Sequence, residues 1–339
     1  MNFLRKILFP IAFVYWIVTW MRNYFYDKHI FKSKSFDLPI IAVGNLSVGG
    51  TGKTPQIEYL IRLLQDEFKV ATLSRGYKRE TNDFVLANDS TTVKEIGDEP
   101  FQFYTKFPKI KVAVDVNRIN GISQLLKLGS KPDVILLDDA FQHRKVKAGF
   151  YILLTTYSEL FCDDFILPFG NLREPSSGKK RANMIIVTKC PSDISELAMI
   201  EVEKKLDVDV PVFFSKIEYD ELSYSDIESI KTDRLKQEQK IIVTGIAKPF
   251  PFISYLKKEN DLVLEFSDHH NFSDKEIDYL NEISKDKAII TTEKDFMRLR
   301  GCLSKEQLYY LPIKSKILND ADVFDKIILD YVGKSSRNG

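Results

Sequence analysis

Residues 47–54 read SVGGTGKT and carry the clearest chemistry in this sequence. They follow an apolar run at residues 38–43 and open a segment of helical periodicity, which is the setting of a phosphate-binding P-loop. Glycines let backbone N–H groups turn toward an anionic phosphate, and the start of the helix adds its positive dipole end. A lysine here neutralises the β- and γ-phosphates, and the hydroxyl after it binds Mg²⁺. The predicted nucleotide-binding residues are Ser47, Val48, Gly49, Gly50, Thr51, Gly52, Lys53 and Thr54.

The first position of this loop departs from the usual pattern, because Ser47 stands where a glycine is expected and Gly44 lies further upstream. Glycine at that position serves a tight turn, and Gly49 and Gly50 still keep the loop flexible. A glycine-rich turn without a ligand is the alternative. The strand before the loop and the helix after it favour phosphate binding.

A second chemical pair, Asp138 and Asp139, ends an apolar stretch that begins at residue 133. In a P-loop fold, an acid at the carboxyl end of a neighbouring parallel strand holds Mg²⁺ directly or through water. Two adjacent acids can divide the work, one near the metal and one toward the substrate. A solvated turn is the alternative, and the apolar strand ahead of the pair favours a magnesium site.

These groups need a parallel sheet to position them, and the apolar runs predict one. Helical spacing lies between the runs, at residues 57–68 and around 119–128, and this β–loop–α–β order is typical of a parallel sheet. We therefore predict an α/β fold with a P-loop NTPase-type parallel sheet and helices on both faces. The predicted strands are residues 38–43, 69–74, 111–114, 133–139, 150–155, 184–188 and 212–215.

A charged stretch at residues 223–238 has no strong apolar period and indicates the end of the first domain. A second α/β alternation follows it and ends in a helix at residues 321–332. We predict three parts, namely an apolar membrane-associating helix at 1–28, a P-loop domain at 29–221 and a smaller α/β domain at 222–339. The strands expected in the last part are 240–244, 262–266 and 288–291, and the helices before the final one are 251–257 and 273–284.

Composition excludes some partners. The chain has 339 residues, with 49 Lys and Arg against 48 Asp and Glu, so its net charge of +1 gives no global field for nucleic acid. The cysteines, Cys162, Cys190 and Cys302, lie far apart without a CxxC pair, which fits a reducing compartment and no structural zinc. No obligate protein partner is evident.

The apolar N-terminus has only Thr19 as a polar residue between positions 7 and 21. As a helix this run spans about 22 Å, short of the roughly 30 Å hydrocarbon core of a bilayer. Trp16 and Trp20 are typical interfacial anchors. We predict a helix that dips into or lies along the membrane, with Lys28, Lys32 and Lys34 on the cytoplasmic side.

A transmembrane anchor is the alternative for this segment, and Pro10 disfavours it because proline disturbs a spanning helix. A signal peptide is disfavoured because no small-residue cleavage site follows.

Further motifs, taken in order, resemble the tetraacyldisaccharide 4′-kinase family of lipid A biosynthesis. The resemblance runs through most of the chain and is specific, with small departures at Ala140 and at Ala148-Gly149. The motifs are VGNLSVGGTGKTP at 43–55, LSRGY at 73–77, GDEP at 97–100, DVILLDDAFQHR at 133–144, LPFGNLREP at 167–175, TGIAKPFPF at 244–252, FSDHHNF at 266–272 and TTEKDFMRL at 291–299.

The resemblance implies a P-loop kinase that uses ATP and Mg²⁺. It would move the γ-phosphate to the 4′-hydroxyl of a tetraacyldisaccharide 1-phosphate, a lipid A precursor, to give lipid IVA. It would work at the cytoplasmic face of a Gram-negative inner membrane as a peripheral or monotopic enzyme. An acylated substrate cannot leave the bilayer cheaply, so an apolar N-terminal helix suits this role.

The resemblance also assigns site residues. It implies Asp98 as the base for the sugar hydroxyl, with a histidine of the Asp-His-His cluster behind it, and we choose His269 over His270. The expected catalytic residues are Asp98, His269, Lys53, Asp138 and Asp139, and the expected metal ligands are Thr54, Asp138 and Asp139. The expected substrate-binding residues are Arg75, Arg118, His143, Arg173 and Glu174, since arginine matches a phosphate with its bidentate fork.

Two other classes of function are weighed against the kinase. A membrane-associated P-loop GTPase or ATPase switch would share the phosphate and Mg²⁺ site. However, residues 188–191 read TKCP where a guanine-reading Asn-Lys-x-Asp is expected, and they lack both its Asn and its Asp. A non-catalytic lipid-binding protein with a degenerate P-loop is disfavoured by the intact Lys53, Thr54 and paired acids.

Overall fold

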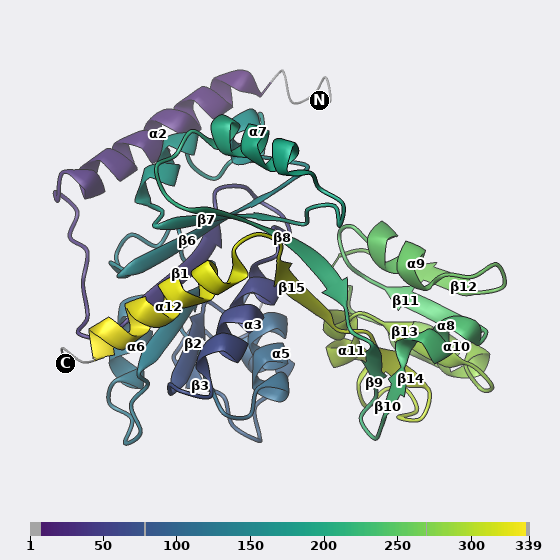
Figure 1. Cartoon of the computed structure of the whole chain (residues 1–339). Helices are drawn as coiled ribbons and strands as arrows, with labels where there is room; N and C mark the ends of the chain where they lie inside the picture. The colour runs from purple at the N-terminus through teal and green to yellow at the C-terminus, as the bar shows by residue number, and fades with distance from the viewer. Residues whose placement is uncertain (1–7, 78, 269, 337–339) are drawn as a thin grey trace. The chain divides into compact units, whose positions relative to one another are not determined.

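The protein is represented by a computed structural model that describes residues 8–77, 79–268 and 270–336. The chain divides into two units (Figure 1). Unit 1 is formed by the described residues of Met1–Ile217 and Ser315–Gly339, and unit 2 is Glu218–Lys314.

A nine-stranded sheet forms the centre of unit 1. Strands β1, β2 and β4 to β8 run parallel, and the short edge strand β3 pairs antiparallel with β4. The strands in spatial order are β15 (Ile313–Ile317), β8 (Val212–Tyr219), β7 (Met184–Thr188), β6 (Phe150–Thr156), β1 (Ile40–Asn45), β5 (Val134–Asp138), β2 (Val70–Ser74), β4 (Lys111–Val114) and β3 (Val85–Leu86).

Helices cover both faces of this sheet, because alternate residues of each strand enter different apolar clusters. In β1, Ile41 and Val43 pack with α3 (Lys53–Leu64), α5 (Asp98–Lys106) and α12 (Ala321–Ser336). Ile40 and Ala42 of the same strand pack on the other face with α6 (Arg118–Leu125). On that second face α7 (Glu196–Leu206) covers β6, β7 and β8. The predicted parallel sheet with helices on both faces is confirmed.

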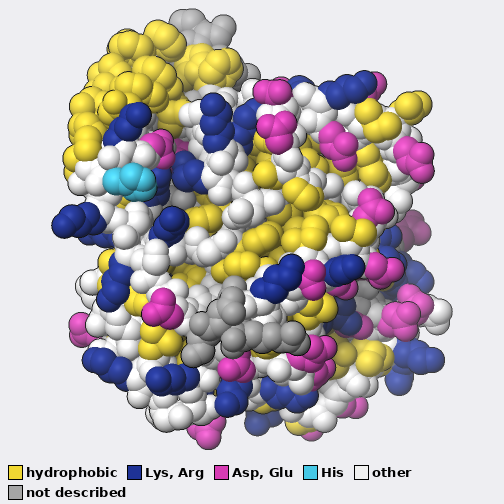
Figure 2. Space-filling view, turned by 60° about the vertical axis from the view of Figure 1, so that its left-hand side comes forward, with side chains coloured by type: hydrophobic (Ala, Val, Ile, Leu, Met, Phe, Trp, Pro, Cys, Tyr) yellow, Lys and Arg dark blue, Asp and Glu magenta, His cyan; other side chains and the backbone are white. Residues whose placement is uncertain are grey.

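The N-terminal helix α2 (Phe9–Asp27) lies along unit 1 with one side inward. Ala12 is buried in the cluster under α7, and the Tyr15 hydroxyl donates to the backbone carbonyl of Arg173 at 2.9 Å. The other side is apolar and exposed, as the yellow surface in Figure 2 shows. Among the described residues, none of the helices has both the length and the apolarity that crossing a bilayer requires.

Unit 2 contains the predicted second α/β alternation. Its strands in spatial order are β10 (Ser229–Lys231), β9 (Leu222–Tyr224), β14 (Leu308–Tyr310), β13 (Ala288–Thr291), β11 (Lys240–Thr244) and β12 (Leu262–Glu265). Strands β11 to β14 are parallel, and β9 pairs antiparallel with β14 and β10. The helices are α8 (Thr232–Gln237), α9 (Phe250–Leu256), α10 (Asp274–Ile283) and α11 (Glu293–Leu299).

The extent of the second unit differs from the 222–339 that we expected. The unit begins at Glu218, and the segment from Ser315 onward belongs to unit 1. The reason is the apolar stripe of α12, where Phe324, Ile328 and Val332 are fully buried against the core that contains α3. The charged stretch at 223–238 also holds β10 and α8 and lies inside unit 2.

Candidate active site

The P-loop joins β1 to α3 and takes a shape that only glycine adopts easily. Gly49 and Gly52 have φ angles of +100° and +86°, in the region that favours glycine. Gly52 caps α3, so Lys53 and Thr54 stand in the first helical turn. At the start of the loop, the Asn45 side chain donates to the carbonyl of Ser47 at 2.6 Å. The loop therefore presents the amino end of a 12-residue helix, as a phosphate site requires.

Gly44 has a packing role that explains its place upstream of the loop. A Cβ at this position would lie 2.7 Å from the Cβ of Phe141, in the segment that follows the paired acids. This close approach brings the end of β1 against the segment after β5. Ser47 instead pairs as an isolated bridge with Leu172, which lays the 167–175 segment along the P-loop.

Lys53, Asp139 and Arg173 form a charged cluster at the carboxyl edge of the sheet. The Lys53 ammonium lies 3.6 Å from Asp139, and Arg173 Nη1 lies 3.0 Å from each carboxylate oxygen of Asp139. Although burial acts to raise it, the charges of Lys53 and Arg173 hold the pKa of Asp139 below its usual value. Asp139 has a φ of +46°, a strained conformation that clusters at functional sites.

Asp138, the last residue of β5, is buried, and within the described chain one of its side-chain oxygens has no hydrogen-bond donor. Its side-chain Oδ1 has no hydrogen-bond partner among the described residues. Burial, with the neighbouring charge of Asp139, raises the pKa of Asp138 to about 6. A buried carboxylate oxygen without a donor suits a cation.

These residues fit Mg²⁺. Magnesium is usually held by one or two carboxylates together with substrate phosphates and water, not by a full protein cage. In the described part of the chain, no group of three or more His, Cys, Asp or Glu residues is placed to bind a metal. Asp138 at the end of β5, the adjacent Asp139, and Thr54 in the first turn of α3 are the residues that would supply protein oxygens to the ion.

Arg118, Arg75 and His143 gather beside the paired acids. Arg118, the first residue of α6, is buried and donates to the backbone carbonyls of Asp115 at 3.0 Å and Asp138 at 3.3 Å. Burial lowers the pKa of Arg118 to about 10, so it stays charged at neutral pH. Burial, then the charges of Arg118 and Arg75, lower the pKa of His143 to about 4. Arg75 itself is exposed after β2.

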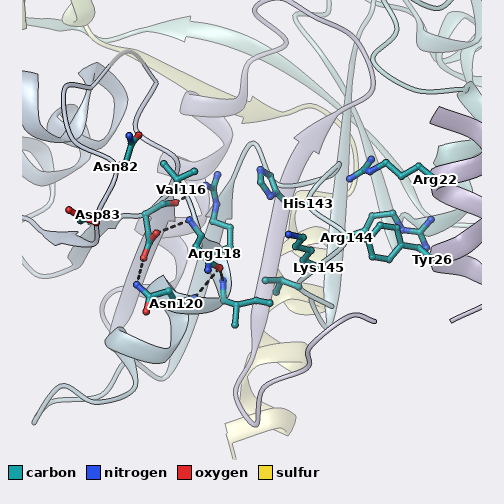
Figure 3. Close-up of a pocket in the computed structure, with 14 residues that line it drawn as sticks. Arg22, Tyr26, Asn82, Asp83, Val116, Arg118, Asn120, His143, Arg144 and Lys145 are labelled. Carbon is teal, nitrogen blue, oxygen red and sulfur yellow. Dashed lines mark hydrogen bonds between the residues drawn. The ribbon is translucent and has the colours of Figure 1, made fainter. Parts of the chain in front are cut away.

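A cavity of about 570 Å³ opens at this cluster. Arg22 and Tyr26 of α2 line one side, and Asn82 and Asp83 lie on the other side (Figure 3). Arg118 and His143 stand between these sides, with further cationic groups at Arg144 and Lys145. The cavity therefore joins the site to the helix with the exposed apolar face.

Glu174 lies in the interior, with its side chain 1% exposed. Its carboxylate accepts hydrogen bonds from Asn23 of α2 at 2.7 Å, Gln142 at 3.0 Å and Arg181 at 2.7 Å. These contacts tie α2 to the segments after β5 and before β7. They use the carboxylate inside the protein, and the substrate contact that we expected of Glu174 stays a prediction.

The expected pair of Asp98 and His269 is only partly described. Asp98 is half-buried at the start of α5, where a Cβ on the preceding Gly97 would lie 3.0 Å from the carbonyl of Tyr77, after β2. This places Asp98 in unit 1 near the end of β2. His269 lies outside the described residues. His270, in unit 2, has its Nε2 3.1 Å from both carboxylate oxygens of Glu276.

Two site amides were missed from the sequence. Asn45 Oδ1 accepts from Lys53 at 3.5 Å, and Gln142 Nε2 donates to the carbonyl of Asn45 at 2.7 Å. Both residues lie in motifs quoted above, VGNLS and DDAFQHR. An amide directly after a strand or after the paired acids is the signal that could have identified them.

The depressed pKa of His143 predicts a pH-dependent stability. The pKa of His143 in the fold, about 4, lies below its ordinary value of 6.5. Between these two pH values the unfolded chain binds more protons than the folded one, so the free energy of unfolding decreases as the pH is lowered. After allowance for partial exposure, we expect a loss of about 1–2 kcal/mol from pH 7 to pH 5 that the variant His143→Gln does not suffer. Urea unfolding of both proteins at the two pH values measures it. Equal losses in both proteins would contradict the assignment.

The P-loop, its lysine and two acids at the carboxyl edge of a parallel sheet define a P-loop nucleotide-binding enzyme. The Tetraacyldisaccharide-1-P 4′-kinase family model matches residues 4–333. This chain belongs to that family, and it is an ATP-dependent kinase that uses Mg²⁺.

The relatives support this membership along the whole chain. The tetraacyldisaccharide 4′-kinase of Flavobacterium johnsoniae is 57% identical, and the match covers 98% of this chain and 98% of that protein. The tetraacyldisaccharide 4′-kinase of Flavobacterium psychrophilum is 56% identical, and the match covers 100% of each. The crystal structure of LpxK from Aquifex aeolicus in complex with ATP has a TM-score of 0.81 and 31% identity, and the match covers 97% of this chain and 99% of that chain. These matches favour the kinase over the GTPase or ATPase switch.

Proposed function

We propose that residues 47–54 bind the phosphates of ATP while the chain phosphorylates the 4′-hydroxyl of a tetraacyldisaccharide 1-phosphate, giving lipid IVA. The observation that carries this proposal is the cluster of Lys53, Asp138 and Asp139 beside the P-loop, in a chain of the kinase family. Lys53 neutralises charge on the transferred phosphoryl group. Thr54, Asp138 and Asp139 would hold Mg²⁺, which would supply further positive charge when bound.

Asp98 is the proposed base for the acceptor. It takes the proton of the 4′-hydroxyl as that oxygen attacks the γ-phosphorus, and the bond from the γ-phosphorus to the β–γ bridging oxygen breaks, leaving ADP. The adjacent Glu99 is close enough to Asp138 for its charge to raise that residue's pKa, which supports a place near the metal end of the site. His269 is the proposed partner of Asp98, since His270 already contacts Glu276.

The cationic cavity is the proposed site for the disaccharide and its 1-phosphate. Arg118 and His143 line it, and Arg75 is near enough to lower the pKa of both. Arg173 contacts Asp139, whose charge acts on both Arg118 and His143. Guanidinium groups suit a phosphate because their N–H groups form bidentate contacts. The cavity adjoins α2, so a sugar headgroup bound there could keep its acyl chains along the apolar helix.

The outer face of α2 is the proposed contact with the cytoplasmic face of the inner membrane. Phe13, Trp16, Trp20 and Tyr24 form a stacked aromatic row along the helix, with ring centroids 5.7–6.2 Å apart. Aromatic side chains of this kind anchor proteins at the membrane interface. The exposed lysines that follow the helix, Lys28, Lys32 and Lys34, supply the charge that anionic headgroups attract.

This membrane contact predicts the effect of changing only outward side chains. Phe13 and Trp20 are 54% and 46% exposed, so the double variant Phe13→Gln/Trp20→Gln should fold normally. Losing both from the interface should weaken binding to vesicles by about ten-fold or more. Sedimentation with anionic vesicles measures it. Val323→Gln, an exposed apolar position on α12, is the control, and an equal loss there would overturn the proposal.

The reaction itself is tested by incubating the protein with ATP, Mg²⁺ and tetraacyldisaccharide 1-phosphate in mixed micelles. Mass analysis should find one added phosphate on the lipid and one ADP for each. Hydrolysis of nucleotide without lipid and without lipid phosphorylation would favour the switch instead.

A further inference from the structure

The loop after β7 contacts the P-loop. The contacts come from the TKCP segment at residues 188–191, which does not match a guanine-reading sequence. The buried Thr188 hydroxyl donates to the carbonyl of Thr51 at 2.7 Å. The Lys189 ammonium donates to the carbonyl of Gly50 at 2.6 Å. Two consecutive peptide groups of the P-loop are thus held by two consecutive side chains.

The backbone around Thr188 and Lys189 is itself fixed. The N–H of Tyr157 donates to the carbonyl of Thr188 at 2.9 Å, and the N–H of Cys190 donates to the carbonyl of Ser215 at 3.0 Å. Lys189 has a φ of +57°, a conformation that is unfavourable for a lysine and persists where the surroundings impose it. The loop after β7 is therefore a rigid support between the strands on either side.

The P-loop needs such a support, because Gly49 and Gly52 leave it free to change shape. In a trans peptide the carbonyl and the following N–H point in opposite directions. By holding the carbonyl of Thr51, the Thr188 hydroxyl turns the N–H of Gly52 away from β7. Preformed N–H directions reduce the entropy that phosphate binding would otherwise lose.

We propose that Thr188 and Lys189 are positioning residues that hold the P-loop in the shape that binds ATP. This inference rests on the proposed nucleotide site at residues 47–54. It also gives the TKCP segment a role without base recognition, since Pro191 stands where an acid would accept hydrogen bonds from guanine. The two side chains act on the loop backbone, and their effect appears first in the affinity for ATP.

The test compares side chains at position 189 in the full-length protein. Lys189→Met keeps an unbranched side chain and removes the ammonium, and we expect it to weaken ATP binding about ten-fold, the size of one charge-assisted hydrogen bond. The KM for lipid should stay unchanged, and Lys189→Arg should restore most of the ATP affinity. Isothermal titration with ATP and steady-state kinetics measure these values. Lys127→Met, at an exposed lysine after α6, is the matched control.

Thr188 gives an independent comparison. Thr188→Val removes only the hydroxyl and should also weaken ATP binding, whereas Thr188→Ser should keep it. Melting temperatures establish that each variant is folded. Unchanged ATP affinity in both Lys189→Met and Thr188→Val, or a Lys189→Arg variant as weak as Lys189→Met, would overturn the inference.

Lys53→Ala separates this failure from a failure of the proposed nucleotide site. If Lys53→Ala loses turnover while Lys189→Met and Thr188→Val both bind ATP normally, only the positioning role is wrong. If Lys53→Ala keeps normal turnover, the nucleotide site itself is misplaced.

Discussion

Lys53→Ala lowers turnover by roughly 10²-fold or more, because phosphoryl transfer depends on charge neutralisation that this ammonium supplies. The fold should persist, since Asp139 keeps its contacts with Arg173 at 3.0 Å when Lys53 is removed. Steady-state kinetics with ATP and lipid give the turnover, and the melting temperature gives the stability. Near-normal turnover in the folded variant would contradict the P-loop assignment.

We expect Asp138→Asn to lower turnover, as Lys53→Ala does, and at the same time to raise the stability of the fold. Turnover should fall by roughly 10²-fold or more because the metal loses a charged ligand. Stability should rise, since the pKa of Asp138 in the fold, about 6, lies above its ordinary 3.8. The ionised form therefore destabilises the fold above pH 6, and the penalty fades as the pH falls toward 4.

In Mg²⁺-free buffer at pH 8, the asparagine variant should be more stable by about 1–3 kcal/mol. The same comparison at pH 4 is the control, because both side chains are then largely neutral. A variant that is both less stable at pH 8 and fully active would remove Asp138 from the metal site.

Asp98→Ala carries the second large effect. Because Asp98 is proposed to act on the acceptor hydroxyl and not on the nucleotide, kcat should fall by roughly 10²- to 10⁴-fold while ATP affinity is nearly unchanged. Titration calorimetry and steady-state kinetics separate the two quantities. A large loss of ATP affinity with an unchanged kcat would assign Asp98 to the nucleotide instead.

The histidine partner is resolved by a set of variants. His269→Ala should cost less than Asp98→Ala, and the double variant should be little worse than Asp98→Ala alone, since residues that act as one unit are non-additive. His270→Ala is the matched comparison, because its ring contacts Glu276. Multiplicative losses for His269, or a larger effect at His270, would move the role to the second histidine.

Local pattern was enough to predict the elements that carry the phosphate and metal chemistry. The P-loop follows a strand and opens a helix, and these signals lie together within residues 38–68. Strands such as β7 and β13 are bounded as predicted because they are continuous apolar runs, buried on both faces. The short strands β9, β10 and β14 were not predicted, since three residues carry no resolvable period.

Contacts between distant segments could not be predicted in this way. Glu174 was expected to bind substrate, and its bond to Asn23 joins residues 151 positions apart. Helix α12 belongs to unit 1 because its apolar side packs against the core of that unit. The sequence of the helix shows that it has an apolar side but does not show which core that side contacts. The pKa of Asp138 likewise depends on burial, a property of the assembled sheet.

The inward and outward sides of α2 have different consequences for preparing this enzyme for inhibitor screening. Three inward residues of α2 donate hydrogen bonds to the segments around the site. Tyr15 donates to the carbonyl of Arg173, Arg22 to the carbonyl of Gln142 at 2.7 Å, and Asn23 to the carboxylate of Glu174. Deleting residues 1–22 would remove the first two of these three hydrogen bonds, together with Arg22 from the cavity wall. Exchanging outward-facing side chains of α2 for polar ones leaves these three hydrogen bonds and the cavity wall in place.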